Sequence, residues 1–254
     1  MSIIRSFEQI EDALRHSTQQ DEYILDGTLV IEEYIDDGEE YSVEVLTTNG
    51  RHEVLAITTK EVVMPYFIEA GHLLPAPLKM EDREAIQETV CSLLTSIGHL
   101  EGPSHTEIKL RRGIPYIIES HTRYGGNQIW DMVRLTTGVN MQRATVCHLL
   151  DIPYVKEKVK YPFCCIKLLL PQVEGKVVIM SVNGVNEAEH MDGIHRISLD
   201  VGEHSELVPA TSNKNYIGYF LGGGSPPEEA AASVEHALSL IRIETASIQQ
   251  VQSI

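Results

Sequence analysis

Basic residues are scarce in this sequence. Its 254 residues contain 20 Lys and Arg against 37 Asp and Glu, which gives a formal net charge of −17. The longest basic run is the pair Arg111-Arg112. Because a surface of this sign repels a phosphate backbone, we expect no nucleic acid among the partners of the protein.

Long apolar runs are lacking as well. No stretch approaches the roughly 18 consecutive apolar residues that a membrane span requires. The first residues have neither the basic start nor the apolar run of a signal peptide. We therefore expect a cytoplasmic protein with no membrane partner.

The sequence also lacks the spacings that mark a zinc site, a disulfide framework or a phosphate loop. The run Gly222-Gly223-Gly224 is not followed by the Lys-Ser/Thr of a phosphate loop, so we interpret it as a turn that precedes an N-cap at Ser225. No CxxC pair is present, and we expect free thiols at Cys91, Cys147, Cys164 and Cys165.

What is present is an α+β pattern of short strands and amphipathic helices. An apolar content of 43% is enough for a core. Ser6 and Gln9 have the spacing of a capping box, which predicts a helix close to the N-terminus. Alternation and turn residues predict strands at 28–31, 41–46, 54–58, 106–110, 115–119, 164–170 and 176–181. Helical periodicity predicts a helix at 82–97, a following glycine supports one at 127–137, and an N-cap serine followed by two prolines predicts one at 226–241.

Two carboxylates on adjacent predicted strands are the first candidates for chemistry. A three-residue loop at 111–113 would place Glu107 opposite Ile117, with Glu119 one diagonal step away on the same face. Two neighbouring carboxylates repel each other unless a cation lies between them, and Mg²⁺ favours such oxygen ligands. The alternative, which spacing alone leaves open, is that both acids face solvent.

The second of these strands ends in the pattern Glu-x-His-x-Arg. Its two-residue period predicts that Glu119, His121 and Arg123 share one face. Arg123 offers a fork of N–H groups for a phosphoryl or carboxylate oxygen. Gly125-Gly126 follows, and it would let the backbone at the start of the next helix approach an anion closely.

Residues 102–110 and 118–127 together resemble the metal-binding hairpin of ATP-grasp enzymes, in particular of the branch that ligates amino acids and dipeptides. The resemblance implies that Glu107 and Glu119 bind the Mg²⁺ ions that bridge the phosphates of ATP, and that Arg123 holds an acyl phosphate. His121 stands where the family usually has an Asn that touches metal or phosphate, and Asn127 stands where an Asp is common.

A second acidic segment, residues 30–44, resembles the connection between the two lobes of the ATP-grasp fold. There the backbone of Glu32, Glu33, Tyr34 and Ile35 would meet adenine, and Glu40 or Glu44 would reach the ribose. Without the resemblance, an ordinary acidic hairpin is the alternative.

Two further segments are similar to recurring parts of the family. Lys60 ends a predicted strand and would contact the nucleotide. A loop at 71–77 could cover the substrate with His72 near the γ-phosphate, although a structural role for this histidine is the alternative.

The resemblance implies a fold with a remnant of the small lobe at 1–35, the large lobe with its antiparallel sheet at 36–150, and a β-rich C-terminal subdomain at 151–254. It implies an ATP- and Mg²⁺-dependent ligase that joins a small, amino-acid-like carboxylate to an amine through an acyl phosphate. We expect a truncated or split form, because no Lys precedes Lys60 and no glycine-rich phosphate loop is present. An N-terminal partner polypeptide or a homo-oligomer would then complete the site.

Two other classes stay open. One is a non-catalytic binding or regulatory module derived from such a ligase. The other is a component of a biotin-dependent carboxylase, although the sequence has no Met-Lys-Met segment of a biotin carrier.

Overall fold

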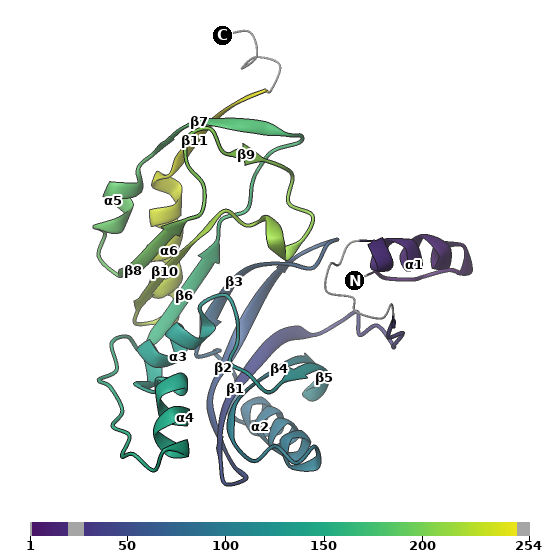
Figure 1. The fold of residues 1–254 in the computed structure, drawn as a ribbon, viewed down its shortest axis with the longest axis vertical. Coiled ribbons are helices and arrows are strands. Elements are labelled where there is room, and N and C mark those ends of the chain that lie inside the picture. Colours follow the sequence, from purple (N-terminus) through teal and green to yellow (C-terminus); the bar gives the residue numbers. More distant parts are fainter. Residues whose placement is uncertain (1, 20–27, 248–254) are drawn as a thin grey trace.

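A computed structural model describes residues 2–19 and 28–247 of the chain (Figure 1). The helical segments are η1 (Phe7–Gln9), α1 (Ile10–Gln19), α2 (Met80–Ser96), α3 (Ile129–Thr137), α4 (Met141–Leu149), α5 (Val185–Glu189), η2 (Asn213–Asn215) and α6 (Pro227–Leu240). The strands are β1 (Glu39–Thr48), β2 (Arg51–Val63), β3 (Ile68–Leu74), β4 (Gly102–Arg111), β5 (Ile114–His121), β6 (Phe163–Leu168), β7 (Val177–Asn183), β8 (Ile194–Leu199), β9 (Glu206–Leu207), β10 (Gly218–Gly224) and β11 (Arg242–Ser247).

The strands form two sheets. The larger has eight strands in the order β5-β4-β1-β2-β3-β6-β10-β8, and the smaller has the order β11-β7-β9. Neighbouring strands run antiparallel throughout. The predicted α+β fold with a large antiparallel sheet and flanking helices is therefore confirmed. The eight-stranded sheet joins strands from both sides of residue 150, and the boundaries at 35 and 150 stay predictions.

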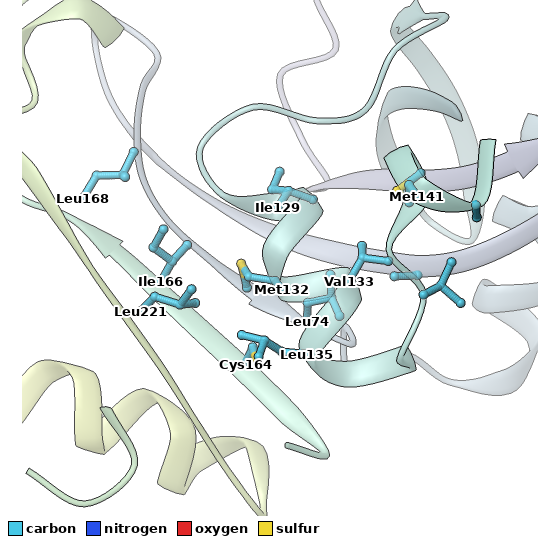
Figure 2. Packing of buried hydrophobic residues seen from close by; sticks show 13 residues of the cluster. Leu74, Ile129, Met132, Val133, Leu135, Met141, Cys164, Ile166, Leu168 and Leu221 are labelled. Carbon is cyan, nitrogen blue, oxygen red and sulfur yellow. The ribbon is translucent and has the colours of Figure 1, made fainter. Parts of the chain in front are cut away.

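Helices cover both faces of the large sheet. On one face, α2 packs against Val43, Ile57 and Ile108, and α6 packs against Phe220. On the other face, α3 and α4 pack on a second apolar cluster (Figure 2). This division follows from alternation along the strands, because Cys164 and Ile166 belong to the second cluster whereas Cys165 belongs to the first face.

The most periodic elements agree with the sequence. The predicted helix 82–97 is α2 and the helix 127–137 is α3, and each ends before a glycine with a positive φ, 70° at Gly98 and 73° at Gly138. Helix α4 and strand β3 were not predicted. No helix in the described ranges 2–19 and 28–247 is long and apolar enough to cross a membrane.

Three local predictions were wrong. Residues 28–31 form no strand, and Val30 and Ile31 are about four-fifths exposed, because a β-rich run needs a partner strand and none pairs with it in the described part. Ser6 makes no side-chain cap; instead the Gln9 N–H donates to its carbonyl. The supposed loop at Gly71-His72 is part of β3.

The three consecutive glycines belong to strand β10 and not to a turn. Side chains would not fit there: a Cβ on Gly223 would lie 2.3 Å from Cγ of Tyr161. The glycines therefore allow the Tyr161 ring to pack directly on the strand. Ser225 follows the strand but does not cap α6, whose N-cap is Pro226.

Candidate functional site

The hairpin of β4 and β5 brings the two predicted carboxylates directly opposite each other. Glu107 pairs with Glu119, and a bulge follows between Glu107 and Ile108. The turn has two residues, Arg112 and Gly113, with φ of 52° and 78°, as tight hairpins require. The predicted three-residue loop, and with it the predicted Glu107–Ile117 pair, was wrong. The correction strengthens the convergence, because opposite residues share a face of the sheet.

The Glu-x-His-x-Arg pattern divides at the end of β5. Nε2 of His121 lies 3.1 Å from Oε1 of Glu119, and both side chains are partly exposed. The strand ends at His121, so the two-residue period does not extend to Arg123. The Arg123 guanidinium donates to the carbonyl of Tyr124 at 3.0 Å. The hairpin thus unites Glu107, Glu119 and His121, while Arg123 lies in the loop that follows.

Glu107 shares its face of β4 with two other polar side chains, and each of the three lies opposite a residue of β1. His105 pairs with Glu44, Glu107 with Ser42, and Lys109 with Glu40. Nδ1 of His105 lies 2.6 Å from Oε1 of Glu44, and Nζ of Lys109 lies 3.3 Å from Oε1 of Glu40. Two charged cross-strand pairs therefore flank Glu107, whose own partner, Ser42, carries no charge.

A buried lysine supplies the cation for Glu107. Nζ of Lys60 lies 2.5 Å from Oε2 of Glu107 and 2.8 Å from Oε1 of Glu69. Only 5% of the Lys60 side chain is exposed. Asn127, just before α3, donates a hydrogen bond from its side-chain amide to Glu69. Lys60 therefore joins two carboxylates from different strands beside the loop that leads into α3.

The ionisation of this network follows from its pairing. Burial alone would raise the pKa of Glu107, but His105 and Lys60 outweigh it and hold the pKa at about 2. Burial alone would lower the pKa of His105, but Glu107 and Glu44 outweigh it and raise the pKa to about 9. For Lys60 as well, the charges of Glu69 and Glu107 overcome burial and raise the pKa.

His72 behaves differently. Its side chain is buried, neither ring nitrogen has a hydrogen-bond partner among the described residues, and Nε2 lies 3.7 Å from Glu69. Burial lowers the pKa of His72 to about 4, so the imidazole is neutral at pH 7.

The segment predicted to meet a nucleotide base lies beside the same face. Glu32, Glu33 and Tyr34 are exposed, and residues 28–36 belong to neither a helix nor a strand. The Tyr34 ring stands 6.2 Å, edge to face, from Phe67, and Nζ of Lys109 lies 5.4 Å from its centre. Ile35 is half-buried. Lys109 thus connects this segment to Glu40.

Of the two predicted ribose carboxylates, only Glu40 is partly exposed. Its side chain is 30% exposed, whereas that of Glu44 is 0% exposed. Glu44 accepts hydrogen bonds from the His105 ring and, at 3.3 Å, from the Gly125 N–H. The geometry therefore gives Glu44 an internal partner and leaves Glu40 as the accessible one of the two carboxylates.

Sequence reasoning missed three members of this arrangement, namely His105, Lys109 and Glu69. A signal existed for two of them, because His105 and Lys109 share the two-residue period of Glu107 on β4. None existed for Glu69, which reaches the site only through the pairing of β3 with β2.

Two family models match the chain. The ATP-grasp domain matches residues 3–131, half of the chain, and the L-amino acid ligase C-terminal domain 2 matches residues 167–246. The chain belongs to the ATP-grasp family. No curated protein sequence matches it.

Solved structures place this ATP-grasp chain near amino-acid ligases. An L-amino acid ligase from Bacillus licheniformis has a TM-score of 0.79 and 26% identity over 95% of this chain and 61% of its own. Phosphoribosylglycinamide synthetase from Anaerococcus prevotii, at 15% identity, has a TM-score of 0.71 over 94% and 60% of the two chains. The chain thus spans about three-fifths of these relatives.

A third relative shares the fold and was solved with a nucleotide. It is the biotin carboxylase domain dimer of the Hydrogenobacter thermophilus 2-oxoglutarate carboxylase, in complex with MgADP, ADP and bicarbonate. Its TM-score is 0.69 at 17% identity, over 94% of this chain and 52% of its own.

The ATP-grasp fold implies a magnesium site, and the paired carboxylates fit one. Within residues 2–19 and 28–247, no group of three or more His, Cys, Asp or Glu could hold a metal ion by itself. Glu107 and Glu119 nevertheless face each other across the hairpin. Mg²⁺ is often held by one or two carboxylates together with substrate phosphates and water, and this donor set suits such a site.

Proposed function

We propose that this chain carries the ATP and metal part of a carboxylate–amine ligase that acts on amino acids. The observation that carries the proposal is the direct pairing of Glu107 with Glu119 on a sheet face where Lys60 and His105 keep Glu107 ionised. The match to the L-amino acid ligase C-terminal domain supports the amino-acid class. A partner polypeptide or a second copy of the chain that completes the site is part of the same proposal.

The nucleotide would lie along the face from Tyr34 to Glu107. The backbone of residues 32–35 would hydrogen-bond adenine, and Glu40 would accept from a ribose hydroxyl. Glu107 and Glu119 would hold Mg²⁺ on the phosphates, and His121 would donate to a phosphate oxygen. Lys60 would hold Glu107 in place beneath the phosphates.

The proposed reaction has two steps. First, an oxygen of the substrate carboxylate attacks the γ-phosphorus, the bond to the β,γ-bridging oxygen breaks, and ADP leaves. Arg123 would donate to the acyl phosphate. An amine then attacks the acyl carbon, loses a proton and expels phosphate. Bound Mg²⁺ would stabilise the charge on the transferring phosphoryl group.

The test measures phosphate release from ATP by the chain mixed with a separately expressed N-terminal partner, in the presence of Mg²⁺ and mixed amino acids. We expect release that depends on amino acids and falls at least about 100-fold in Glu107→Gln and in Glu119→Gln. Glu244→Gln, an exposed acid on β11, is the matched control and should retain the rate.

Equal rates in wild type and both active-site variants would contradict the assignment of the carboxylates. Binding of Mg-ATP in calorimetry without any phosphate release, even with a separately expressed N-terminal part, would instead favour the non-catalytic module.

A further inference from the structure

The imidazole of His105 lies between two carboxylates of different strands. Nδ1 is 2.6 Å from Oε1 of Glu44, and Nε2 is 3.3 Å from Oε1 of Glu107. Ionised carboxylates only accept hydrogen bonds, so the ring donates to both. With 5% of its side chain exposed, His105 has little freedom to turn away.

Both oxygens of Glu107 are therefore held. Oε1 faces His105 and Oε2 faces Lys60. A carboxylate with a donor on each oxygen keeps its plane, and its remaining lone pairs keep one direction. Ser42, the cross-strand partner of Glu107 on β1, does not orient the carboxylate, because its hydroxyl has no hydrogen-bond partner among the described residues.

The other side of Glu44 holds the loop that leads into α3. Its second oxygen accepts the N–H of Gly125 at 3.3 Å. A Cβ on Gly125 would lie 2.8 Å from Nδ1 of His105 and 3.2 Å from both oxygens of Glu44. The backbone thus packs directly on the pair, next in the chain to Arg123 and Tyr124.

We propose that Glu44 and His105 are positioning residues that lock Glu107 and the loop at Gly125 into one unit. Glu44 would orient the imidazole, and the imidazole would orient the carboxylate. The metal role of Glu107 rests on the function proposed above, whereas the link between Glu44, His105 and Gly125 does not. These contacts would hold the Glu107 carboxylate in a fixed position relative to Arg123, which lies two residues before Gly125.

The test uses the whole chain with His105→Gln, Glu44→Gln and the double variant. The matched control is His52→Gln, because His52 also bridges two side chains on the sheet, Thr47 at 2.9 Å and Thr95 at 3.2 Å, and lies outside the site. Two quantities are measured: hydrogen exchange of the peptide that contains Gly125, without ligand, and the affinity for Mn²⁺ in the presence of ATP, by electron paramagnetic resonance.

Each single variant should speed exchange at Gly125 about tenfold, because the N–H loses a charged acceptor or its support. Each should weaken Mn²⁺ binding by about 10 to 100-fold, the usual effect of removing the partner of a metal ligand. In Mn²⁺ affinity the double variant should resemble His105→Gln alone, because Glu44 acts on the carboxylate through the imidazole. In exchange at Gly125 it should resemble Glu44→Gln alone, because Glu44 accepts that N–H directly. His52→Gln should change neither quantity.

Wild-type exchange and Mn²⁺ affinity in the single variants would overturn the proposal, and so would strictly additive losses in the double variant. Absence of Mn²⁺ binding by wild type would count against the proposed function, and the exchange measurement would then still decide whether Glu44 and His105 hold Gly125. Should His105→Gln fail to fold, Glu44→Gln, which keeps the imidazole, carries the same expectations.

Discussion

One face of the large sheet has two halves that are buried in opposite ways. From β4 to β3 this face carries Glu44, His105, Glu107 and Lys60, and from β6 to β10 it carries aliphatic side chains such as Ile166 and Leu221 (Figure 2). Glu44 and Ile166 are both 0% exposed. Both halves therefore exclude water. The charged half does so by pairing opposite charges, and the aliphatic half does so by packing hydrocarbon side chains.

The two halves should respond differently to change. In the aliphatic half, stability depends on filled volume, which pH and salt do not alter. In the charged half, each side chain is tolerated only because an opposite charge touches it, so the loss of one partner leaves an uncompensated buried charge. Charge pairing therefore fixes the positions of the side chains in the charged half, and it also makes the stability of that half depend on pH.

Lys60→Met should produce the largest effect. The substitution keeps the length of the side chain but removes the cation that touches Glu69 and Glu107. Breaking a buried pair in this way typically costs about 3 to 5 kcal/mol of unfolding free energy. Chemical denaturation at pH 8 and pH 5 measures it, and the loss should shrink at pH 5 because protonation of the carboxylates becomes easier without Lys60.

A loss that is the same at both pH values would contradict this view of the charged half. Lys156→Met is the control, because Lys156 pairs with Glu53 where both side chains are 58% exposed. Its effect should stay within about 0.5 kcal/mol.

Leu221→Ala tests the aliphatic half. Leu221 is buried opposite Ile166, and its truncation should leave a cavity and cost about 2 to 5 kcal/mol of unfolding free energy. The same denaturation series should give one value from pH 5 to pH 8, since no titrating group is touched. A clear dependence on pH would show that the two halves are not independent, while Leu149→Ala, at an exposed position, should cost little.

Gly125→Ala tests how closely the charged half is packed. The added methyl group would press on His105 and Glu44, at 2.8 and 3.2 Å, and such overpacking typically costs about 1 to 3 kcal/mol. Gly126→Ala is the neighbouring control, because apart from its chain neighbours no atom of the described residues lies within 4 Å of its Cβ position. Thermal unfolding of the two variants should separate them, and equal unfolding temperatures would contradict the close contact.

The sequence predicted the two halves unequally. Helix α3, which packs on the aliphatic half, could be placed because Gly138 follows it. On the charged face, residue spacing alone pointed to Glu107, Glu119 and His121, because they lie on one hairpin, whereas Lys60, Glu40 and Glu44 were predicted through the family resemblance. Strand β3 brings Glu69 and His72 to the site, and its pairing with β2 depends on tertiary contacts that no local pattern records.

The errors have the same origin. The register of β4 and β5 was missed by one residue beside the turn, because the turn is one residue shorter than predicted, and by two residues at Glu107, because a bulge adds another residue. Neither the shorter turn nor the bulge is visible in the alternation of the sequence. Glu44 was assigned to a ribose on the strength of the family resemblance. Only the position of His105 and of the Gly125 backbone shows that this side chain faces inward.

His72→Leu should have the smallest effect at neutral pH and a distinctive one in acid. His72 lies where the two halves meet, opposite Lys60 on one side and Ile166 on the other. Since its ring nitrogens have no hydrogen-bond partner in the described part, an apolar residue of similar size should change the unfolding free energy at pH 7.5 by less than about 1.5 kcal/mol.

The dependence on pH has a definite sign. Burial lowers the pKa of His72 to about 4 in the folded protein, against about 6.5 when unfolded. Between these values the unfolded chain takes up a proton that the folded protein refuses, so the wild type loses stability as pH falls from 6.5 to 4. His72→Leu lacks this loss and should become the more stable of the two by urea denaturation near pH 4.5. Parallel stability curves would mean that the imidazole is accommodated in its charged form beside Glu69, and that His72 belongs to the charged half rather than to the aliphatic one.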